Sequence, residues 1–364
     1  LVAFYRLILS YIYFRSINCS YSRINSSRVG PIPIYTSNRP RPIYRRYYST
    51  NSLNLQRRVT ALNPNFVSGL IDAEGSFVVT ILKRSDYSLG WAVQARLQIK
   101  LHEIDRDLLL SVQEFFGDIG YISKINNRSA VEFRVSKISD IVNVIIPHLE
   151  KYSLKTNKRT DFSIFATIIK LLLENKHKTS EGLQEILNYR AGLNWGLPEN
   201  LKISFPLTQP ISRTLFNKAA GKLSESISPE WLAGFCTGES NFFIAISNRK
   251  GGGTSTWLRF SIGQDSRDIA LLESVVKFFG CGKVYRIKNR EVCEFVVTKI
   301  DDIINIIIPF FDKHLILGSK HMNYIKFKEA TNLIKNKQHL NEGGIYIIKE
   351  LKNSMNKTIK TQID

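Results

Sequence analysis

The chain has little cysteine. Its 364 residues include four, namely Cys19, Cys236, Cys281 and Cys293. None forms a Cys-x-x-Cys pair, and no histidine stands at a spacing suited to zinc. This pattern argues against a zinc finger. It favours reduced thiols in a reducing compartment, because disulfide frameworks are typical of much shorter secreted chains.

Acidic residues are missing from the first sixty positions, which also lack lysine but contain ten arginines. Such a composition, rich in serine and tyrosine as well, is typical of an organellar transit peptide. An equal interpretation is a segment derived from an upstream exon, in frame with an intron reading frame. Both interpretations predict a mitochondrial protein with a disordered leader.

A long hydrophobic run is also missing. The apolar stretch 1–14 is interrupted by Arg6 and is shorter than the ~20 residues that a membrane-spanning helix needs. We therefore expect no membrane association. The formal charge of +20 indicates instead a polyanionic partner, with about half of the excess in the leader and half in the body.

One segment of the chain occurs twice, at an offset of 165 positions. The first copy runs from Phe66 to Phe77 (FVSGLIDAEGSF), and the second runs from Trp231 to Phe242 (WLAGFCTGESNF). Each copy predicts an apolar helix that ends in an acid and is followed by a strand. An acid at the end of a helix is poorly placed for stability. Two of them therefore suggest a functional site.

The repeat continues beyond this segment, with an offset that drifts from 165 to 161. Such an extended match predicts two copies of one fold. The matching pairs are Arg106-Asp107 with Arg267-Asp268, Phe115-Phe116-Gly117 with Phe278-Phe279-Gly280, Glu132-Phe133 with Glu294-Phe295, Lys137-Ile138 with Lys299-Ile300, Ile145-Ile146-Pro147 with Ile307-Ile308-Pro309, and Glu181-Gly182 with Glu342-Gly343.

With these residues the chain resembles the LAGLIDADG homing endonuclease family in its monomeric, two-motif form. The last acid of each motif falls on Glu74 and Glu239, whereas Ser240 replaces the final glycine of the second motif. The resemblance implies an α+β fold of two pseudo-symmetric αββαββα halves. Their strands would form a saddle-shaped antiparallel sheet, with the motif helices at the interface.

The chain is expected to divide into five parts. These are a basic leader at 1–60, an N-terminal half at 61–195, a linker at 196–227, a C-terminal half at 228–355 and a tail at 356–364. Strict alternation between Trp91 and Leu101 predicts a strand with one polar face. The expected strands are 76–83, 91–101, 120–125 and 130–136, then 241–248, 255–264, 282–288 and 291–298. The expected helices are 105–116, 139–151 and 157–175, then 267–279, 301–313 and 319–336.

Small residues in both motif helices would let the two backbones approach closely. These residues are Ser68, Gly69, Ala73, Ala233, Gly234 and Gly238. The approach would bring Glu74 and Glu239 together, as ligands of Mg²⁺ or Mn²⁺. Hydrolysis of a phosphodiester needs an activated water and a neutralised leaving oxygen, which two metal ions supply. The alternative is a pair of helix-end acids in surface ion pairs.

Three further residues gain a role from the resemblance. The family carries a basic residue near the scissile phosphates, at Lys158 and Lys320 here, which would polarise water or offset transition-state charge. Gln264 matches a polar residue that supports the metal-bound water, although its counterpart is Leu101. The lysines alternatively belong to a solvated face. Asp72 is expected to be structural, because its counterpart is Thr237.

The polar faces of the strands are the expected DNA surface. A two-stranded ribbon fits the major groove, where Arg and Lys read guanine and Gln or Asn read adenine. A hydrated polar face without a ligand is the alternative. The candidates are Thr80, Arg84, Gln94, Arg96, Gln98, Lys100, Lys124 and Arg134 in the first half, and Ser247, Arg249, Arg259, Ser261, Arg286 and Lys288 in the second.

The pattern predicts a monomeric DNA endonuclease that makes a metal-dependent double-strand break in a target of roughly 20 bp. The resemblance implies cutting across the minor groove with short 3′ overhangs, in support of intron mobility. An RNA maturase that helps its own intron to fold is the alternative, because the family includes such proteins. A DNA-binding regulator derived from the same fold is a third interpretation.

Overall fold

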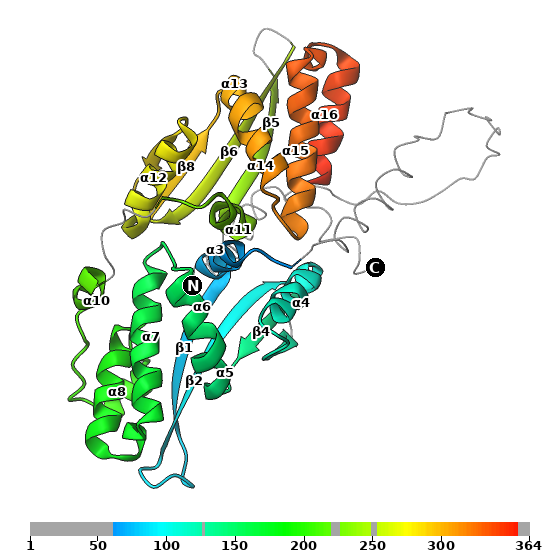
Figure 1. Cartoon of the computed structure of the whole chain (residues 1–364). Coiled ribbons are helices and arrows are strands. Elements are labelled where there is room, and N and C mark those ends of the chain that lie inside the picture. Colours follow the sequence, from blue (N-terminus) through cyan, green and yellow to red (C-terminus); the bar gives the residue numbers. More distant parts are fainter. Residues whose placement is uncertain (1–60, 126–127, 220–225, 249–252, 356–364) are drawn as a thin grey trace, which may run out of the picture. The chain divides into compact units, whose positions relative to one another are not determined.

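The computed structural model describes residues 61–125, 128–219, 226–248 and 253–355. The leader and Arg249 therefore lie outside the described residues. Two four-stranded antiparallel sheets organise this part of the chain, with strand orders β1-β2-β4-β3 and β5-β6-β8-β7. The identical order in both sheets confirms the predicted α+β fold of two pseudo-symmetric halves (Figure 1).

The first motif forms helix α3 (Pro64–Glu74). Asn63 begins it, because its side chain accepts a hydrogen bond from the Asn65 backbone N–H, and Pro64 occupies the first turn, where no N–H is needed. The helix is buried along most of its length. It ends at Glu74, and strand β1 begins at the next residue, so no loop separates the acid from the sheet.

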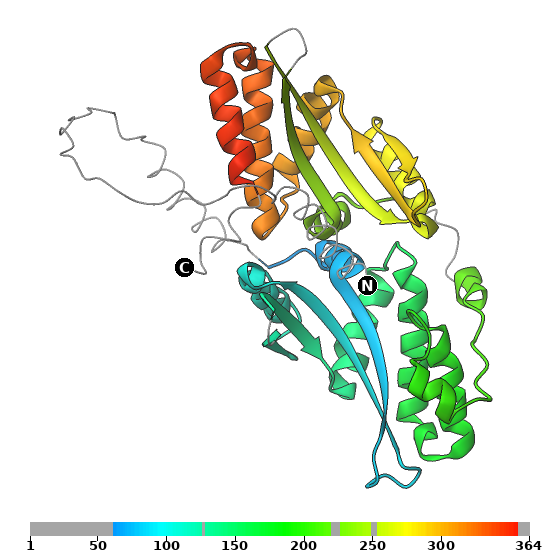
Figure 2. The same cartoon turned by 180° about the vertical axis from the view of Figure 1, so that it is seen from behind.

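The first sheet has one core face and one polar face, as the alternation predicts. Strand β1 (Gly75–Lys83) pairs with β2 (Trp91–His102) along their whole length, and the two run side by side in both views (Figures 1 and 2). Strand β4 (Ala130–Val135) pairs with β2 and with the edge strand β3 (Tyr121–Ile125). Phe77, Val79 and Ile81 are buried in the core.

Helices pack on the core side of this sheet. After a 3₁₀ turn (Glu103–Asp105), the helices are α4 (Arg106–Phe115), α5 (Ile138–Asp140), α6 (Ile146–Lys151), α7 (Lys158–Leu173) and α8 (Ser180–Gly192). The expected helix at 139–151 contains a π-helical turn at Ile141–Ile145, directly before Pro147, which has no N–H to donate. Helix α8, which packs beside α7, was not predicted from the sequence (Figure 1).

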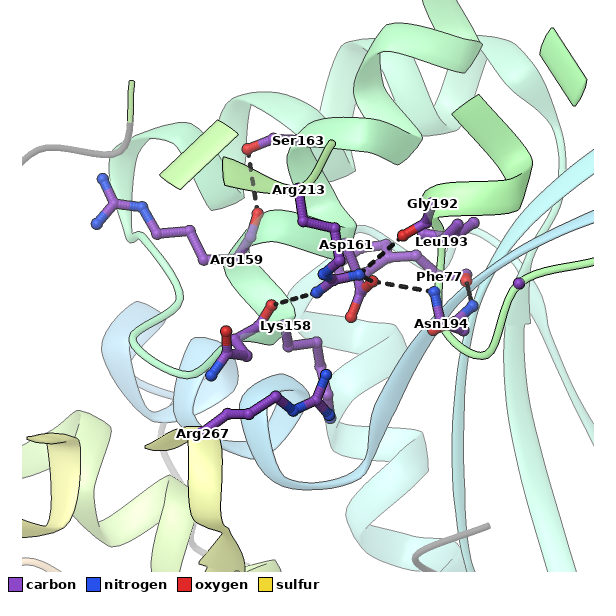
Figure 3. A network of polar contacts seen from close by, with 12 residues as sticks. Phe77, Lys158, Arg159, Asp161, Ser163, Gly192, Leu193, Asn194, Arg213 and Arg267 are labelled. Carbon is purple, nitrogen blue, oxygen red and sulfur yellow. Dashed lines mark hydrogen bonds and ion pairs between the residues drawn. The ribbon is translucent and has the colours of Figure 1, made fainter. Parts of the chain in front are cut away.

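The segment after α8 contains two short helices, α9 (Glu199–Ser204) and α10 (Thr214–Ala219). Arg213 fastens it to α7, because its guanidinium forms an ion pair with Asp161 and donates to the Gly192 carbonyl at 2.9 Å (Figure 3). Asn194 ties the same region to β1 by donating to the Phe77 carbonyl at 2.8 Å. The segment is therefore anchored to the first half.

The second half repeats this order. It comprises α11 (Pro229–Glu239), β5 (Ser240–Asn248), β6 (Thr254–Asp265), a 3₁₀ turn (Ser266–Asp268), α12 (Ile269–Phe279), β7 (Lys283–Arg286), β8 (Val292–Val297), α13 (Ile300–Asp302), a π turn (Ile303–Ile307), α14 (Ile308–Lys313), α15 (Ser319–Lys335), a second 3₁₀ turn (Gln338–Leu340) and α16 (Glu342–Ser354). Helix α16, like its counterpart α8, was not predicted from the sequence.

One repeat match was wrong. The Arg-Asp dipeptides pair Asp107 with Asp268 in the sequence, but α4 begins at Arg106 and α12 begins at Ile269. The structural counterpart of Asp268 is therefore Asp105, the last residue of the preceding 3₁₀ turn in the first half. Residues of the two halves therefore correspond by their position relative to the start of the helix, and not by the shared Arg-Asp dipeptide.

The helices α3 and α11 pack backbone against backbone. A Cβ added at Gly69 would overlap the carbonyl oxygen of Trp231, and one added at Gly234 would overlap the carbonyl oxygen of Phe66. These two contacts are related by the 165-residue repeat, since Phe66 matches Trp231 and Gly69 matches Gly234. The predicted close approach is confirmed at both glycines.

We expect Gly234→Ala to lower the free energy of unfolding by about 2–3 kcal/mol, because the added methyl group forces the two backbones apart. Urea unfolding of the purified protein measures this loss. Gly343→Ala in α16 is the matched control, because a Cβ there meets only the Asn341 side chain at 3.6 Å. Equal stability of the two variants would show that the close helix contact is not required.

Candidate active site

Glu74 and Glu239 end the two packed helices. Glu74 is half-buried, and Glu239 is 8% exposed. A Cβ placed at Gly238 would meet the Ala73 Cβ at 2.6 Å and the Glu74 Oε1 at 2.8 Å. The Glu74 carboxylate from the first half therefore lies against the residue that immediately precedes Glu239. The packing brings the end of α3, which carries Glu74, against the end of α11, which carries Glu239.

Ser240 occupies the position of the final motif glycine without strain. Its φ of −79° and ψ of 157° are close to those of Gly75, at −75° and 155°, and both describe extended backbone. The Ser240 hydroxyl donates to the Cys236 carbonyl at 2.6 Å. The replacement of glycine by serine is therefore compatible with the same chain direction after each acid.

Lys158 binds the C-terminal end of α3. Its ammonium donates to the carbonyl oxygens of Asp72 at 2.7 Å and Ile71 at 3.2 Å. Burial lowers the pKa of Lys158, whereas the nearby charges of Asp72, Glu239 and Glu74 oppose this shift. A cation at a helix C-terminus is favourable, so Lys158 stabilises the last turn of α3 and lies in the field of both acids.

Lys320 lies at the corresponding position in the second half. Its ammonium donates to the Ser240 carbonyl at 2.6 Å, one residue beyond the end of α11. Each lysine thus donates to backbone carbonyl oxygen at the end of the motif helix of its own half.

Asp72 is structural, as the sequence predicts. It is buried and accepts hydrogen bonds from the Lys155 N–H at 2.7 Å, the Thr156 hydroxyl at 2.6 Å and the Trp231 indole N–H at 3.0 Å. Burial raises the pKa of Asp72, while these donors oppose the shift. The carboxylate therefore joins α3 to the loop before α7 and to α11 of the other half.

The counterpart of Asp72 is Thr237, which binds the corresponding loop of the second half. Its single hydroxyl can form fewer hydrogen bonds to that loop than a carboxylate can. The Thr237 hydroxyl accepts from the Leu317 N–H at 3.3 Å and donates to the Ala233 carbonyl at 3.0 Å. A hydroxyl carries no formal charge, so the second half lacks the charge-assisted bonds of the first.

Two aspartates accept hydrogen bonds from residues of the opposite half, and these contacts were not predicted. Asp268 accepts from the Asn157 backbone N–H at 2.8 Å and from its side-chain amide at 2.9 Å. Asp105 in turn accepts from the backbone N–H of Ser319 and, at 2.8 Å, from its hydroxyl. Asn157 and Ser319 directly precede Lys158 and Lys320. The reciprocal bonds therefore hold both lysine-bearing helix starts against the opposite half.

Gln264 lies on β6, directly opposite the buried Cys293. This register places it on the core-facing side of the sheet, near the end of the strand. Leu101 occupies the equivalent place opposite Val131 in the first sheet. Any role for the amide is therefore confined to the second half.

The polar face of the first sheet carries most of the expected DNA-contacting residues. The register places Thr80, Gln94, Arg96, Gln98, Lys100 and Arg134 on that face. Arg96 donates to the Gln98 side chain and to the Thr80 hydroxyl, both at 3.1 Å. Gln94 and Lys100 are exposed.

Gln98 departs from the prediction of an exposed base-reading residue, because it is only 8% exposed. It lies on the central strand β2, with Ser76 and Arg134 opposite it on either side. Glu132 on the same face is also buried and forms ion pairs with Arg134 at 2.6 Å and Lys100 at 3.6 Å. Long basic side chains thus cover the centre of this face.

Four of the expected residues lie elsewhere. Lys124 is opposite the buried Val131 and pairs with Glu103, and Arg286 is opposite the buried Cys293, so the register assigns both to the core side. The prediction that they lie on the polar face was wrong. Neighbouring residues of a strand point to opposite faces, so a shift of one residue changes the face. Arg84 lies beyond β1 in an ion pair with Asp86 at 2.8 Å, and Lys288 is exposed in the turn after β7.

In the second half, Ser247 is exposed near the end of β5, and Arg259 forms an ion pair with Glu294 on the polar face. Ser261 was expected to be exposed, but it is 1% exposed between Asn241 of β5 and Val296 of β8. A small side chain on a central strand is readily covered by larger neighbours.

Within the residues that the structure describes, no group of three or more His, Cys, Asp or Glu is placed to hold a metal ion. No helix in that part of the chain is long and apolar enough to cross a membrane.

The burial of Asp268 predicts a pH dependence of stability, although the hydrogen bonds from Asn157 oppose the shift of its pKa. Burial raises the pKa of Asp268 to about 6, so the protonated form is favoured in the folded chain. The stability that the protonated Asp268 carboxyl adds to the folded chain is fully present below about pH 4. This stability is lost as the pH rises through 6. We expect the unfolding free energy of the wild type, relative to Asp268→Asn, to fall by about 2 kcal/mol between pH 4 and pH 7 in urea unfolding.

Asp86→Asn is the comparison variant for this measurement. Arg84 lowers the pKa of the exposed Asp86, so the corresponding difference should change in the opposite direction as the pH rises. If the difference in unfolding free energy between the wild type and Asp268→Asn does not depend on pH, the raised pKa of Asp268 is contradicted.

The chain is similar in sequence to known proteins. The LAGLIDADG endonuclease family matches residues 67–169 and 232–331. The probable intron-encoded endonuclease 2 of Neurospora crassa is 60% identical over 81% of this chain, and the probable intron-encoded endonuclease 3 is 35% identical over 83%. The chain spans 65% and 55% of the length of these relatives.

Solved structures agree in fold. The crystal structure of the I-SmaMI LAGLIDADG homing endonuclease bound to cleaved DNA is 35% identical, with a TM-score of 0.76, over 81% of this chain and 97% of that one. The same enzyme bound to uncleaved DNA in the presence of calcium ions matches equally well. Both family matches cover a motif helix and the sheet that follows it. The chain therefore belongs to the LAGLIDADG endonuclease family.

Proposed function

We propose that this protein is a site-specific homing endonuclease that makes a metal-dependent double-strand break in DNA. One observation carries the proposal. Glu74, from the first half, lies against Gly238, the residue before Glu239, where α3 and α11 pack backbone against backbone. Two carboxylates related by a pseudo-twofold repeat suit a reaction that cuts two antiparallel strands at equivalent positions.

The residues present fit a divalent metal with oxygen ligands, Mg²⁺ or Mn²⁺. Glu74 and Glu239 would supply the protein ligands, and scissile phosphates would supply the others. A bound metal would lower the pKa of a water molecule and neutralise charge on the leaving oxygen. Glu74 is half-buried and Glu239 is buried, and this setting strengthens their interaction with a cation.

The lysines position these acids and add positive charge. Lys158 holds the last carbonyls of α3, and Lys320 holds the first carbonyl after α11, so both fix the chain beside a carboxylate. Their ammonium groups also favour an anionic phosphate nearby. Gln264 would support water in the second half only.

Duplex DNA would lie along the polar faces of both sheets, each covering about one helical turn, so a target of roughly 20 bp is expected. Arg96, Arg134 and Lys100 are the principal contacts in the first half, and Arg259 is the principal contact in the second. Cutting across the minor groove would leave short 3′ overhangs and promote intron mobility. The chain acts as a monomer, because one polypeptide contains both halves.

The remaining assignments follow from the sequence. The part that acts on DNA comprises residues 61–195 and 228–355, joined by the linker at 196–227, with a tail at 356–364. The arginine-rich residues 1–60 support a mitochondrial location. Assistance to its own intron RNA is the second candidate, favoured by the basic surface that RNA shares with DNA as a ligand.

We expect the double variant Glu74→Gln, Glu239→Gln to bind target duplex with at least wild-type affinity but to cut it at least 100-fold more slowly. Glutamine keeps the shape and removes the charge that holds a cation. The target is selected from a randomised duplex library by cleavage with Mg²⁺, and binding and cutting are then measured on the same duplex. Glu199→Gln, on the exposed start of α9, is the control and should cut normally.

Persistent cutting by the double variant would remove the proposed mechanism. If the wild-type protein cuts no duplex from the library with Mg²⁺ or Mn²⁺, yet binds its intron RNA tightly, the maturase is the correct function. Binding of duplex without any metal-dependent scission would instead indicate a regulator.

A further inference from the structure

The polar faces of the two sheets have diverged in chemistry. Where β2 carries Gln94, the register gives Trp257 on β6, and where β1 carries Thr80, β5 carries Ala245. Lys100, Arg134 and Ser123 are replaced in the same way by Gly263, Val296 and Tyr285. The arginine at the centre is kept, as Arg96 and Arg259. Both faces mix polar and apolar residues, but the second carries the aromatic rings Phe243, Trp257 and Tyr285 where the first carries Val78, Gln94 and Ser123.

Aromatic rings stand exposed on the second face. Phe243 is 41% exposed, Trp257 is 44% exposed and Tyr285 is 52% exposed. Phe243 and Trp257 come from neighbouring strands and pack against each other, with ring centroids 5.6 Å apart. The register places all three on the side opposite the core residues Phe242, Ile244 and Phe295. They are therefore not part of the protein core.

Two polar atoms on the same face as these rings have no hydrogen-bond partner among the described residues. The Ser261 hydroxyl and the Arg259 Nε are buried on the same strand as Trp257, and within the described residues neither has a hydrogen-bond partner. Ser261 is 1% exposed. A buried donor without a partner costs stability, so a polar ligand or a bridging water is expected next to the aromatic rings.

We propose that the second half reads thymine, through contact of Phe243, Trp257 and Tyr285 with C5-methyl groups in the major groove. The thymine methyl is the apolar group that a base pair presents in that groove. Duplex DNA is the favoured occupant because Arg259 and the exposed Lys283 flank the rings on one continuous face. This inference rests on the proposed function and adds base chemistry to it.

The proposal makes the target asymmetric. The half-site under β1, β2 and β4 is read by hydrogen bonds from Gln94, Arg96 and Lys100, which suit adenine and guanine edges. The half-site under β5 and β6 is read by shape and methyl contact, with Arg259 as the polar anchor. A library-selected site should therefore have a thymine cluster in one half only.

A uracil scan tests this directly. Each thymine of the selected duplex is replaced singly by deoxyuridine, which removes only the methyl group, and binding by the full chain is measured. We expect a loss of about threefold to fourfold for each contacted methyl, the ratio that corresponds to about 0.8 kcal/mol for a buried methylene. The losses should cluster in one half-site.

Matched variants assign the effect to the rings. Trp257→Gln introduces the residue found at the equivalent position of the first half, and Phe243→Val does the same for Val78. Each variant should reduce the uracil effect at the position that its own ring contacts, and should keep the effect at the positions that the other two rings contact. Gln94→Ala on the first sheet is the comparison, and it should weaken both duplexes alike while keeping the uracil effect.

The outcomes separate this inference from the proposed function. Cutting of the thymine duplex with Mg²⁺, but no uracil effect at any position, would overturn methyl reading and leave the nuclease intact. An unchanged uracil effect in both Trp257→Gln and Phe243→Val would also overturn it. Failure to bind or cut any duplex would remove the proposed function itself, together with the inference.

Discussion

The contact between α3 and α11 is the constraint on which the rest of the structure depends. Gly69 and Gly234 leave no room for a side chain between the two backbones, so each helix fixes the other. Each helix ends at an acid, and a strand begins at the next residue. The position of Glu74 relative to Glu239, and the starting point of each sheet, therefore follow from one helix pair.

Reciprocal polar contacts reinforce this arrangement. Asp72 of α3 accepts from the Trp231 indole of α11, and Asp268 and Asp105 each bind the start of a lysine-bearing helix in the opposite half. Buried carboxylates need such donors, because an unpaired charge in the interior is costly. The site is thus held by groups from both halves, which accounts for its formation from a duplicated unit rather than from either copy alone.

The two copies agree at the centre and differ at the periphery. The acids, the glycines and the central arginines repeat, whereas the outer positions of the polar faces change from Gln94, Thr80 and Lys100 to Trp257, Ala245 and Gly263. Under the proposed function, cleavage of two strands requires the symmetry at the acids. Recognition of a non-palindromic target would require the two faces to differ.

The sequence predicted the elements that carry strong periodicity. The alternation of Phe77, Val79 and Ile81 gave the core face of β1, and the small residues of the two motifs gave the close helix pair. Helices α8 and α16 were missed, since each begins within a polar, glycine-containing stretch, at Gly182 and at Gly343-Gly344. Alternation also assigns a residue to a face without showing what covers it, so the burial of Gln98 and Ser261 was not foreseen.

Contacts between distant parts of the chain were beyond sequence reasoning. Asp105 and Ser319 are 214 residues apart, and no local pattern connects them. The shared Arg-Asp dipeptide even pointed to Asp107, which lies two residues after Asp105, the residue that makes the contact. Such contacts arise from the helix pair and can be inferred only once the two halves are placed together.

The central claim is that Glu74 and Glu239 hold metal together. Anomalous scattering from Mn²⁺, in crystals of the protein with an uncleaved duplex, tests it most directly. The account predicts manganese peaks within coordination distance of both carboxylates, at the ends of α3 and α11. Manganese bound by neither acid, or by one acid while the other turns away, would contradict it.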